Sequence, residues 1–110
     1  MPEVKFHFHP EANAEFDQAV EHYEQLQFGL GLEFAEEVCG AIARIMEYPD
    51  AWSPMSKNTR RCLINRFPYG VIYRMKTNNL YIIAVANLHR RPAYWRERIE
   101  PDNRVERDQL

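Results

Sequence analysis

The chain has 110 residues, enough for one compact domain with a single core and too few for two. Hydrophobic residues make up 45% of it and aromatic residues 13%, which is typical of a folded globular protein and excludes a disordered chain. The net charge of −2 conceals an asymmetry: residues 1–50 contain eleven acidic and two basic residues, and residues 51–110 contain twelve basic and five acidic residues. Such segregation predicts one acidic and one basic face, and the basic face either serves solubility alone or meets a polyanion or an acidic partner.

The chain shows no sign of a membrane segment or a secretory leader. Its longest nearly uninterrupted apolar run, LYIIAVANL at residues 80–88, has nine residues, whereas a membrane-spanning helix needs about 20. No basic segment followed by an apolar stretch opens the chain, so we expect no signal peptide. Cys39 and Cys62 lack the spacing of a metal site, and we expect both to be reduced core residues of a cytoplasmic protein.

The first half of the chain predicts one strand and two helices. Residues 3–8 alternate apolar and polar side chains, as a half-buried strand does. Pro10 then indicates a helix entry. Two apolar stripes follow at spacings of three or four residues, the mark of amphipathic helices: Ala12, Phe16, Ala19, Tyr23 and Leu26, then Phe34, Val38, Ile42 and Ile45. Because the break at residues 29–31 is short and rich in glycine, the helices are expected to form an antiparallel hairpin.

The second half predicts three strands after a polar loop at residues 50–59. The strands are expected at residues 60–67, 69–76 and 80–88, and asparagine in the last turn tolerates a positive φ. The last strand is apolar on both sides, so it should be central and covered on both faces. We therefore predict an α+β fold in the order strand, helix, helix and three strands, a small antiparallel sheet with the helix hairpin packed on one face and the other face open. Residues 3–98 form this single domain, and residues 99–110 are expected to be a charged C-terminal tail.

Four segments in this order carry a resemblance to a known family. They are HPEANAEFDQAVEHYEQLQFGLGLEF, IMEYPDAW, RRCLINRFPYGVIYRM and IIAVANLHRRPAYWRER. The chain resembles the RelE/ParE superfamily of toxins from bacterial type II toxin–antitoxin modules, whose members are often named plasmid stabilisation proteins. The resemblance implies the fold reached above and a growth-arresting toxin that a cognate antitoxin neutralises. RelE-like members cleave messenger RNA on the ribosome without a metal, ParE-like members inhibit DNA gyrase, and other members have no assigned target.

The residues available for RNA cleavage lie in the second half of the chain. The reaction needs a base for the ribose 2′-hydroxyl, an acid for the leaving oxygen and cations for the phosphate charge. His89 can fill either proton-transfer role, and Arg66 and Arg74 can hold the phosphate. Tyr94 can stack on a base or donate its hydroxyl. These four catalytic candidates lie at places comparable to the arginine, histidine and tyrosine groups of resembling members, whose catalytic set varies.

A second set of residues offers binding contacts. The candidate binding residues are Arg60, Arg61, Arg90, Arg91 and Trp95. Each has a structural alternative: Arg60 and Arg61 can be plain surface residues, Arg90 and Arg91 can be a solvated strand exit or bind glutamates of the first helix, and Trp95 can close over the core as an aromatic lid. His7 and His9 share one side of a strand, but no third ligand is evident, so we expect no metal and no cofactor.

Two features favour gyrase or an unassigned target over messenger RNA. The sequence pI is about 6.1, whereas ribosome-dependent nucleases of the family are strongly basic. The loop at residues 50–59 holds a single lysine, Lys57, where those nucleases are lysine-rich. The further alternative is an interaction module that keeps the fold and lacks toxicity. For the antitoxin we expect a small, partly disordered protein with acidic residues in the segment that folds onto the toxin.

Overall fold

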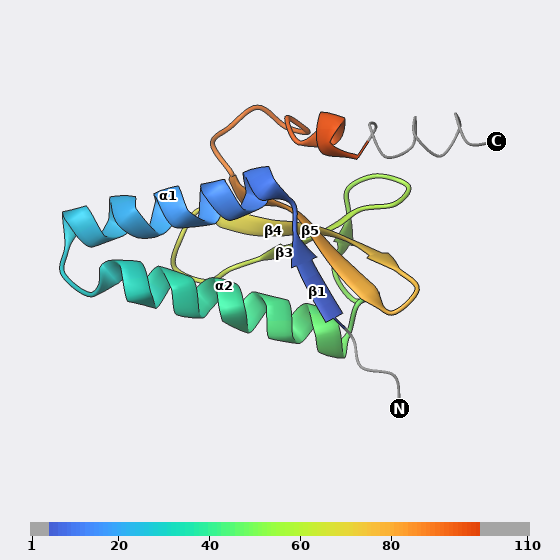
Figure 1. Cartoon of the computed structure of the whole chain (residues 1–110), viewed down its shortest axis with the longest axis horizontal. Coiled ribbons are helices and arrows are strands. Elements are labelled where there is room, and N and C mark those ends of the chain that lie inside the picture. The colour runs from blue at the N-terminus through green and yellow to red at the C-terminus, as the bar shows by residue number, and fades with distance from the viewer. Residues whose placement is uncertain (1–4, 100–110) are drawn as a thin grey trace.

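The fold was obtained as a computed structural model, and it describes residues 5–99 (Figure 1). Its elements in chain order are β1 (Lys5–Phe8), α1 (Pro10–Leu26), α2 (Leu30–Glu47), β2 (Ser53–Pro54), β3 (Arg60–Leu63), β4 (Tyr69–Lys76), β5 (Asn79–Asn87) and the short 3₁₀ helix η1 (Arg96–Arg98). Within the described residues no helix is long and apolar enough to span a membrane.

One five-stranded sheet runs in the order β1-β5-β4-β3-β2. The pairs from β2 to β5 are antiparallel, and β5 lies inside the sheet as predicted. The α+β fold with a helix hairpin is confirmed, and the expected antiparallel pairing needs one correction, because β1 pairs with β5 in parallel and makes the sheet mixed. The two helices separate β1 from the other strands, so no tight turn forces an antiparallel pairing there.

The turn between α1 and α2 and the close packing of the two helices depend on glycine residues and on one carboxylate. Gly29 has a φ of 87°, a conformation that favours glycine, and it precedes α2. The Glu24 carboxylate of α1 accepts hydrogen bonds from the backbone N–H groups of Gly29 and Gly31 at 3.0–3.1 Å, so it caps the N-terminus of α2. A Cβ on Gly31 would lie 2.6 Å from the Val20 carbonyl oxygen, so only glycine allows the helices to approach this closely.

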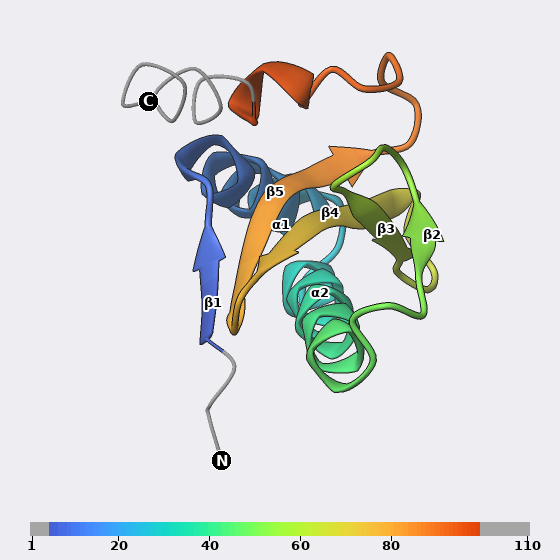
Figure 2. The same ribbon diagram turned by 90° about the vertical axis from the view of Figure 1, so that its right-hand side faces the viewer.

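Two cores lie on opposite sides of the sheet. Figure 2 shows the sheet curving around the helix pair, with residues 93–99, the C-terminal segment, lying across the other side. The larger core fills the space between helices and sheet, and its central aromatic side chains are Phe34, Phe67, Tyr23 and Tyr69. The smaller core consists of Ile72, Ile83, Ala84 and Ala86 from the sheet with Trp95 and Ile99 from the C-terminal segment.

The C-terminal segment corrects two expectations. The sheet face expected to be open is half covered, because residues 93–99 pack on it. Ile99, which the prediction placed in the tail, is buried in this smaller core, and the rest of the predicted tail, residues 100–110, lies outside the described residues.

Local details differ from the sequence expectations at three positions. The strand expected over residues 60–67 ends at Leu63, and Arg66 in the following turn has a φ of 73°. In the turn between β4 and β5 the positive φ belongs to Thr77 and not to an asparagine. Cys39, expected in the core, is exposed on α2, whereas Cys62 is buried as predicted.

Candidate functional site

A single carboxylate, Glu15 of α1, binds the edge of the sheet where β1 has ended. The last pair of β1 with β5 is Phe8 with Ile82, and beyond it no strand of the described residues pairs with β5 on that side. The Glu15 carboxylate accepts the Val85 N–H at 3.1 Å, while Arg98 donates to the Ile83 carbonyl oxygen at 2.9 Å. β5 also has a bulge at this point, between the residues that pair with Ile72 and Tyr73 of β4. Two side chains thus satisfy backbone groups that a longer β1 would have bonded.

The same carboxylate fastens the C-terminal segment. Arg98 donates to both oxygens of Glu15 at 2.9 Å, and the Tyr94 hydroxyl donates to Glu15 at 2.6 Å. The side chains of Glu15 and Arg98 are 13% and 8% exposed, so this ion pair is largely shielded from water. Arg90 lies 3.8 Å from the centre of the Tyr94 ring and 3.5 Å from the carboxylate. We call these four residues the Glu15 clasp.

The clasp determines what Tyr94 can do chemically. Burial and the hydrogen bond and negative charge of Glu15 raise the pKa of Tyr94 well above its ordinary value. Its hydroxyl is therefore neutral and committed to the carboxylate. The sequence placed Glu15 off the apolar stripe of its helix and gave no signal of its burial, because that burial depends on where β1 ends.

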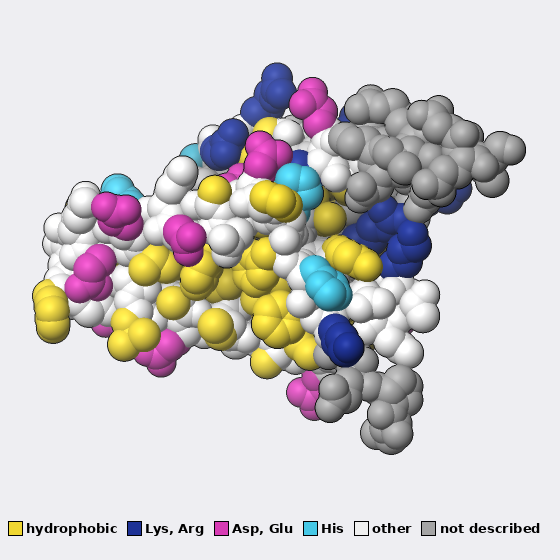
Figure 3. Space-filling model, in the orientation of Figure 1, with side chains coloured by type: hydrophobic (Ala, Val, Ile, Leu, Met, Phe, Trp, Pro, Cys, Tyr) yellow, Lys and Arg dark blue, Asp and Glu magenta, His cyan; other side chains and the backbone are white. Residues whose placement is uncertain are grey.

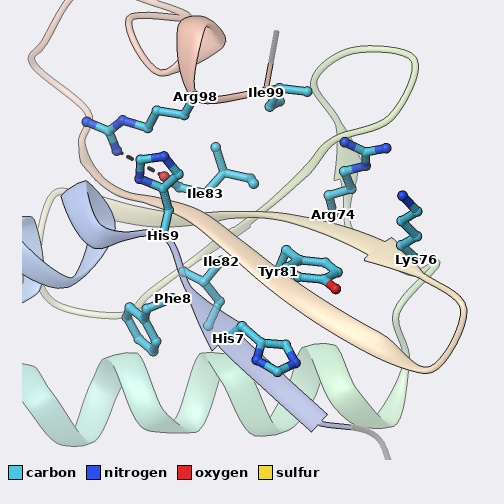
Figure 4. A pocket seen from close by; sticks show the side chains of 10 residues that line it. All are labelled: His7, Phe8, His9, Arg74, Lys76, Tyr81, Ile82, Ile83, Arg98 and Ile99. Carbon is cyan, nitrogen blue, oxygen red and sulfur yellow. Dashed lines mark hydrogen bonds between the residues drawn. The ribbon is translucent and has the colours of Figure 1, made fainter. Parts of the chain in front are cut away.

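The uncovered half of the outer sheet face forms a groove of about 530 Å³ next to the C-terminal segment (Figure 4). Strand register places His7 of β1, Tyr81 of β5 and Arg74 of β4 directly beside one another in a row across the sheet. The residues lining the groove are His7, Phe8, His9, Arg74, Lys76, Tyr81, Ile82, Ile83, Arg98 and Ile99. None of these described lining residues is acidic, so the groove has a cationic rim. Figure 3 shows Lys and Arg side chains gathered at this end of the molecule.

Contacts within the groove fix its aromatic wall. The His7 and Tyr81 rings stack with centroids 5.2 Å apart, and His7 Nε2 lies 3.1 Å from Asn79 Oδ1. His9 uses its Nδ1 to accept the Glu11 N–H at the start of α1. Both histidines therefore have structural contacts: His7 stacks on Tyr81, and His9 caps the start of α1.

Arg74 is the one predicted catalytic residue in this groove. Its side chain is half-buried, and within residues 5–99 it forms no hydrogen bond or ion pair. On its other side it borders a smaller hollow of about 270 Å³, which Lys57, Arg60 and Asp50 also line. Among residues 5–99 the Arg74 guanidinium is therefore unpaired, and a guanidinium is a group that binds carboxylates and phosphates.

The other catalytic candidates do not converge on Arg74. Arg74 pairs with Tyr81 and Tyr69 pairs with Asn87, so the strand end that precedes His89 lies five residues away along β4, about 17 Å. His89 is exposed and forms no side-chain hydrogen bond with Arg66 or Arg74 in the described part of the chain. Arg66 instead pairs with Glu33 of α2 at 2.7 Å.

The binding candidates divide between structural and exposed positions. Trp95 is 4% exposed and packs in the smaller core, so it is an aromatic lid and not a surface contact. Arg60 donates to the Trp52 carbonyl oxygen at 2.7 Å, and Arg61 is partly buried beside Gly70, where its Nε has no hydrogen-bond partner among the described residues. Arg91 is exposed, and Arg90 belongs to the Glu15 clasp.

Comparison with known proteins gives a likeness at the level of fold. No family model and no curated protein matches the chain. Among solved structures, the chain is similar to one described as the chromosomal ParDE TA system from P. aeruginosa, with a TM-score of 0.66 and 15% identity over 78% of this chain and 97% of that chain. The protein thus shares its fold with a chain of that system, as the resemblance implied.

Proposed function

We propose that this protein is the toxin of a type II toxin–antitoxin module, that it arrests growth in the cytoplasm, and that a cognate antitoxin neutralises it. The observation that carries the proposal is the fold shared with a chain of a ParDE system over nearly the whole length of that chain. The segregated charges add support, because a cationic groove on the outer sheet face suits an acidic neutralising segment.

Within this proposal, gyrase or an unassigned target ranks ahead of messenger RNA. An RNA-cleaving site needs its base, acid and phosphate-binding cations within reach of one phosphodiester. Here His89 and Arg74 are separated along the sheet, and the Tyr94 hydroxyl is held by Glu15. The net charge of −2 also suits binding inside the ribosome poorly.

Two biochemical assays separate the targets. If gyrase is the target, the purified protein lowers supercoiling activity and no messenger RNA is cut. If messenger RNA is the target, cleavage appears in a ribosome assay, and Arg74→Ala and His89→Ala each abolish it while the protein stays folded.

Expression in a bacterial host tests toxicity itself and separates the toxin from a non-toxic interaction module. Tightly induced expression of the chain alone is expected to stop growth, and co-expression of the neighbouring reading frame is expected to restore it. Unchanged growth under both conditions would leave only the interaction module.

A further inference from the structure

A hollow of about 330 Å³ lies beside the Glu15 clasp, between α1 and the ends of β4 and β5. One of its walls is a single face of α1, because Glu15, Ala19 and His22 follow one another at spacings of four and three residues. The facing wall holds Tyr69 and Asn87, which are direct partners in the β4–β5 register. This volume suits a small organic molecule and is larger than an inorganic ion would fill.

Several polar groups that line the hollow are free to bond a ligand. Among residues 5–99 no hydrogen bond involves the side chains of Gln18 and His22, the Tyr69 hydroxyl or the side-chain N–H groups of Asn87. Asn87 uses only its Oδ1, which accepts the His89 N–H at 2.9 Å. The two walls therefore offer amide, imidazole and phenol groups to a molecule placed between them.

Arg90 supplies the hollow with a cation whose contact with Glu15 is the loosest of the clasp. It lies 3.5 Å from that carboxylate, whereas Arg98 and Tyr94 bond the same group at 2.6–2.9 Å. The Arg90 side chain is 54% exposed and rests on the Tyr94 ring. Because both Glu15 oxygens are bonded to Arg98, an anion in the hollow can bond Arg90 while the Glu15 charge stays balanced.

The charges around the hollow limit its occupant to one anionic group. A nucleic acid needs a series of cations for successive phosphates, and Arg90 is the only arginine or lysine among the described lining residues. Asp17 and Glu21, exposed carboxylates on α1 next to lining positions, would repel further negative charge.

We propose that this hollow binds a small organic molecule with one anionic group, which Arg90 bonds, and amide-like polar groups, which Gln18 and Asn87 bond. Amide side chains match the N–H and C=O groups of a planar ring such as a pyrimidine, because each of them can both donate and accept. This site requires neither growth arrest nor an antitoxin, and it is therefore independent of the proposed function.

Four probes test the two requirements on the full chain: orotate with its neutral counterpart uracil, and uridine monophosphate with its neutral counterpart uridine. The first pair tests a carboxylate and the second a phosphate, and calorimetry gives the affinities. At least one anion is expected to bind with a Kd below about 5 mM and about tenfold or more tightly than its neutral counterpart. Its binding should shift the amide NMR signals of Gln18, His22 and Asn87.

Substitutions then assign the anion contact. Arg90→Gln is expected to weaken the bound anion by about tenfold or more. Arg91→Gln makes the same charge change at the next residue, which is exposed and does not line the hollow, and should leave the affinity within about twofold.

A second pair of variants guards against an effect of misfolding, because Arg90 also belongs to the clasp. Gln18→Ala removes an exposed amide that bonds no described residue, so the circular dichroism spectrum should be unchanged while the affinity falls by about threefold or more. Gln25→Ala removes an exposed amide of the same helix outside the hollow and should leave the affinity within about twofold.

Four results would overturn the proposal: no binding of either anion, equal affinities for an anion and its neutral counterpart, equal weakening by Arg90→Gln and Arg91→Gln, or inorganic phosphate binding as tightly as the better anion. These outcomes differ from failure of the proposed function. A chain that binds the anion through Arg90 and does not stop growth would keep the site and lose the toxin. A chain that stops growth and binds neither anion would keep the toxin and lose the site.

Discussion

Glu15 is a helical glutamate of a kind that ordinarily faces water, yet its side chain is only 13% exposed. It joins α1 to β5 and to the C-terminal segment through Val85, Tyr94 and Arg98. A pattern of apolar spacing assigns such a residue to the solvent side, because spacing carries no information on the backbone groups that β1 leaves unpaired. By contrast, Trp95 as a lid was within reach of sequence reasoning, since large aromatics near a chain end usually pack.

Replacing Glu15 by alanine is expected to lower the free energy of unfolding by about 3 kcal/mol, because it leaves the buried Arg98 guanidinium with only the exposed Glu11 carboxylate at 3.5 Å and leaves the Val85 N–H unbonded. Urea unfolding followed by circular dichroism measures the change. Glu21→Ala, which removes an exposed glutamate from the same helix, should cost less than about 0.5 kcal/mol. Similar losses for the two variants would show that the clasp contributes little.

The buried Tyr73 hydroxyl is expected to make the free energy of unfolding fall at high pH. Burial raises its pKa to about 12, and its hydroxyl donates to the Pro49 carbonyl oxygen. The unfolded chain releases the tyrosine proton near pH 10, so this contribution is complete below pH 10 and is lost as pH rises to about 12, on the order of 2 to 3 kcal/mol. In Tyr73→Phe the unfolding free energy should fall less steeply between pH 10 and pH 12; an unchanged slope would contradict the assignment.

At the scale of elements, periodicity predicted the two helices and their hairpin, and the turn residues predicted the β4–β5 hairpin. The direction of β1 and the two-residue β2 were missed. Adjacent strands joined by short turns must pair antiparallel, whereas the partner and direction of β1 depend on how the helix hairpin returns the chain. For the same reason the groove was not predicted: its row of His7, Tyr81 and Arg74 comes from three strands that only the sheet brings together.

Replacing glycine by alanine is expected to have opposite effects on stability at two positions of α2. Gly31→Ala is expected to destabilise the protein by about 1 to 3 kcal/mol, because the new methyl group would meet the Val20 carbonyl oxygen at 2.6 Å. At Gly40 the nearest atom is the end of the Arg44 side chain at 3.5 Å, so Gly40→Ala should raise stability by roughly 0.5 to 1 kcal/mol. Thermal unfolding of both variants provides the measurement, and a neutral Gly31→Ala would show that the helices can separate.

At the scale of the whole molecule, the charge asymmetry of the sequence becomes two surfaces. The helix hairpin carries most of the acidic residues, and the outer sheet face carries the cationic groove (Figure 3). Part of the basic half is paired with acidic residues of the helices, because Arg98 and Arg90 bind Glu15 and Arg66 binds Glu33. Of Arg90 and Arg91, whose structural alternative was contact with glutamates of the first helix, Arg90 contacts Glu15 and Arg91 is exposed. The groove around Arg74 is an outward-facing cationic surface.

The central claim, that the chain is a toxin held by a partner, is tested most directly by counting viable cells after induction. Cells expressing the intact chain should stop dividing within about a generation, and cells that also express the neighbouring reading frame should form colonies normally. The clasp variant Glu15→Ala, which is predicted to be unstable, should be less toxic at the same expression level. Undiminished colony counts from cells that accumulate the folded, soluble chain would contradict the claim.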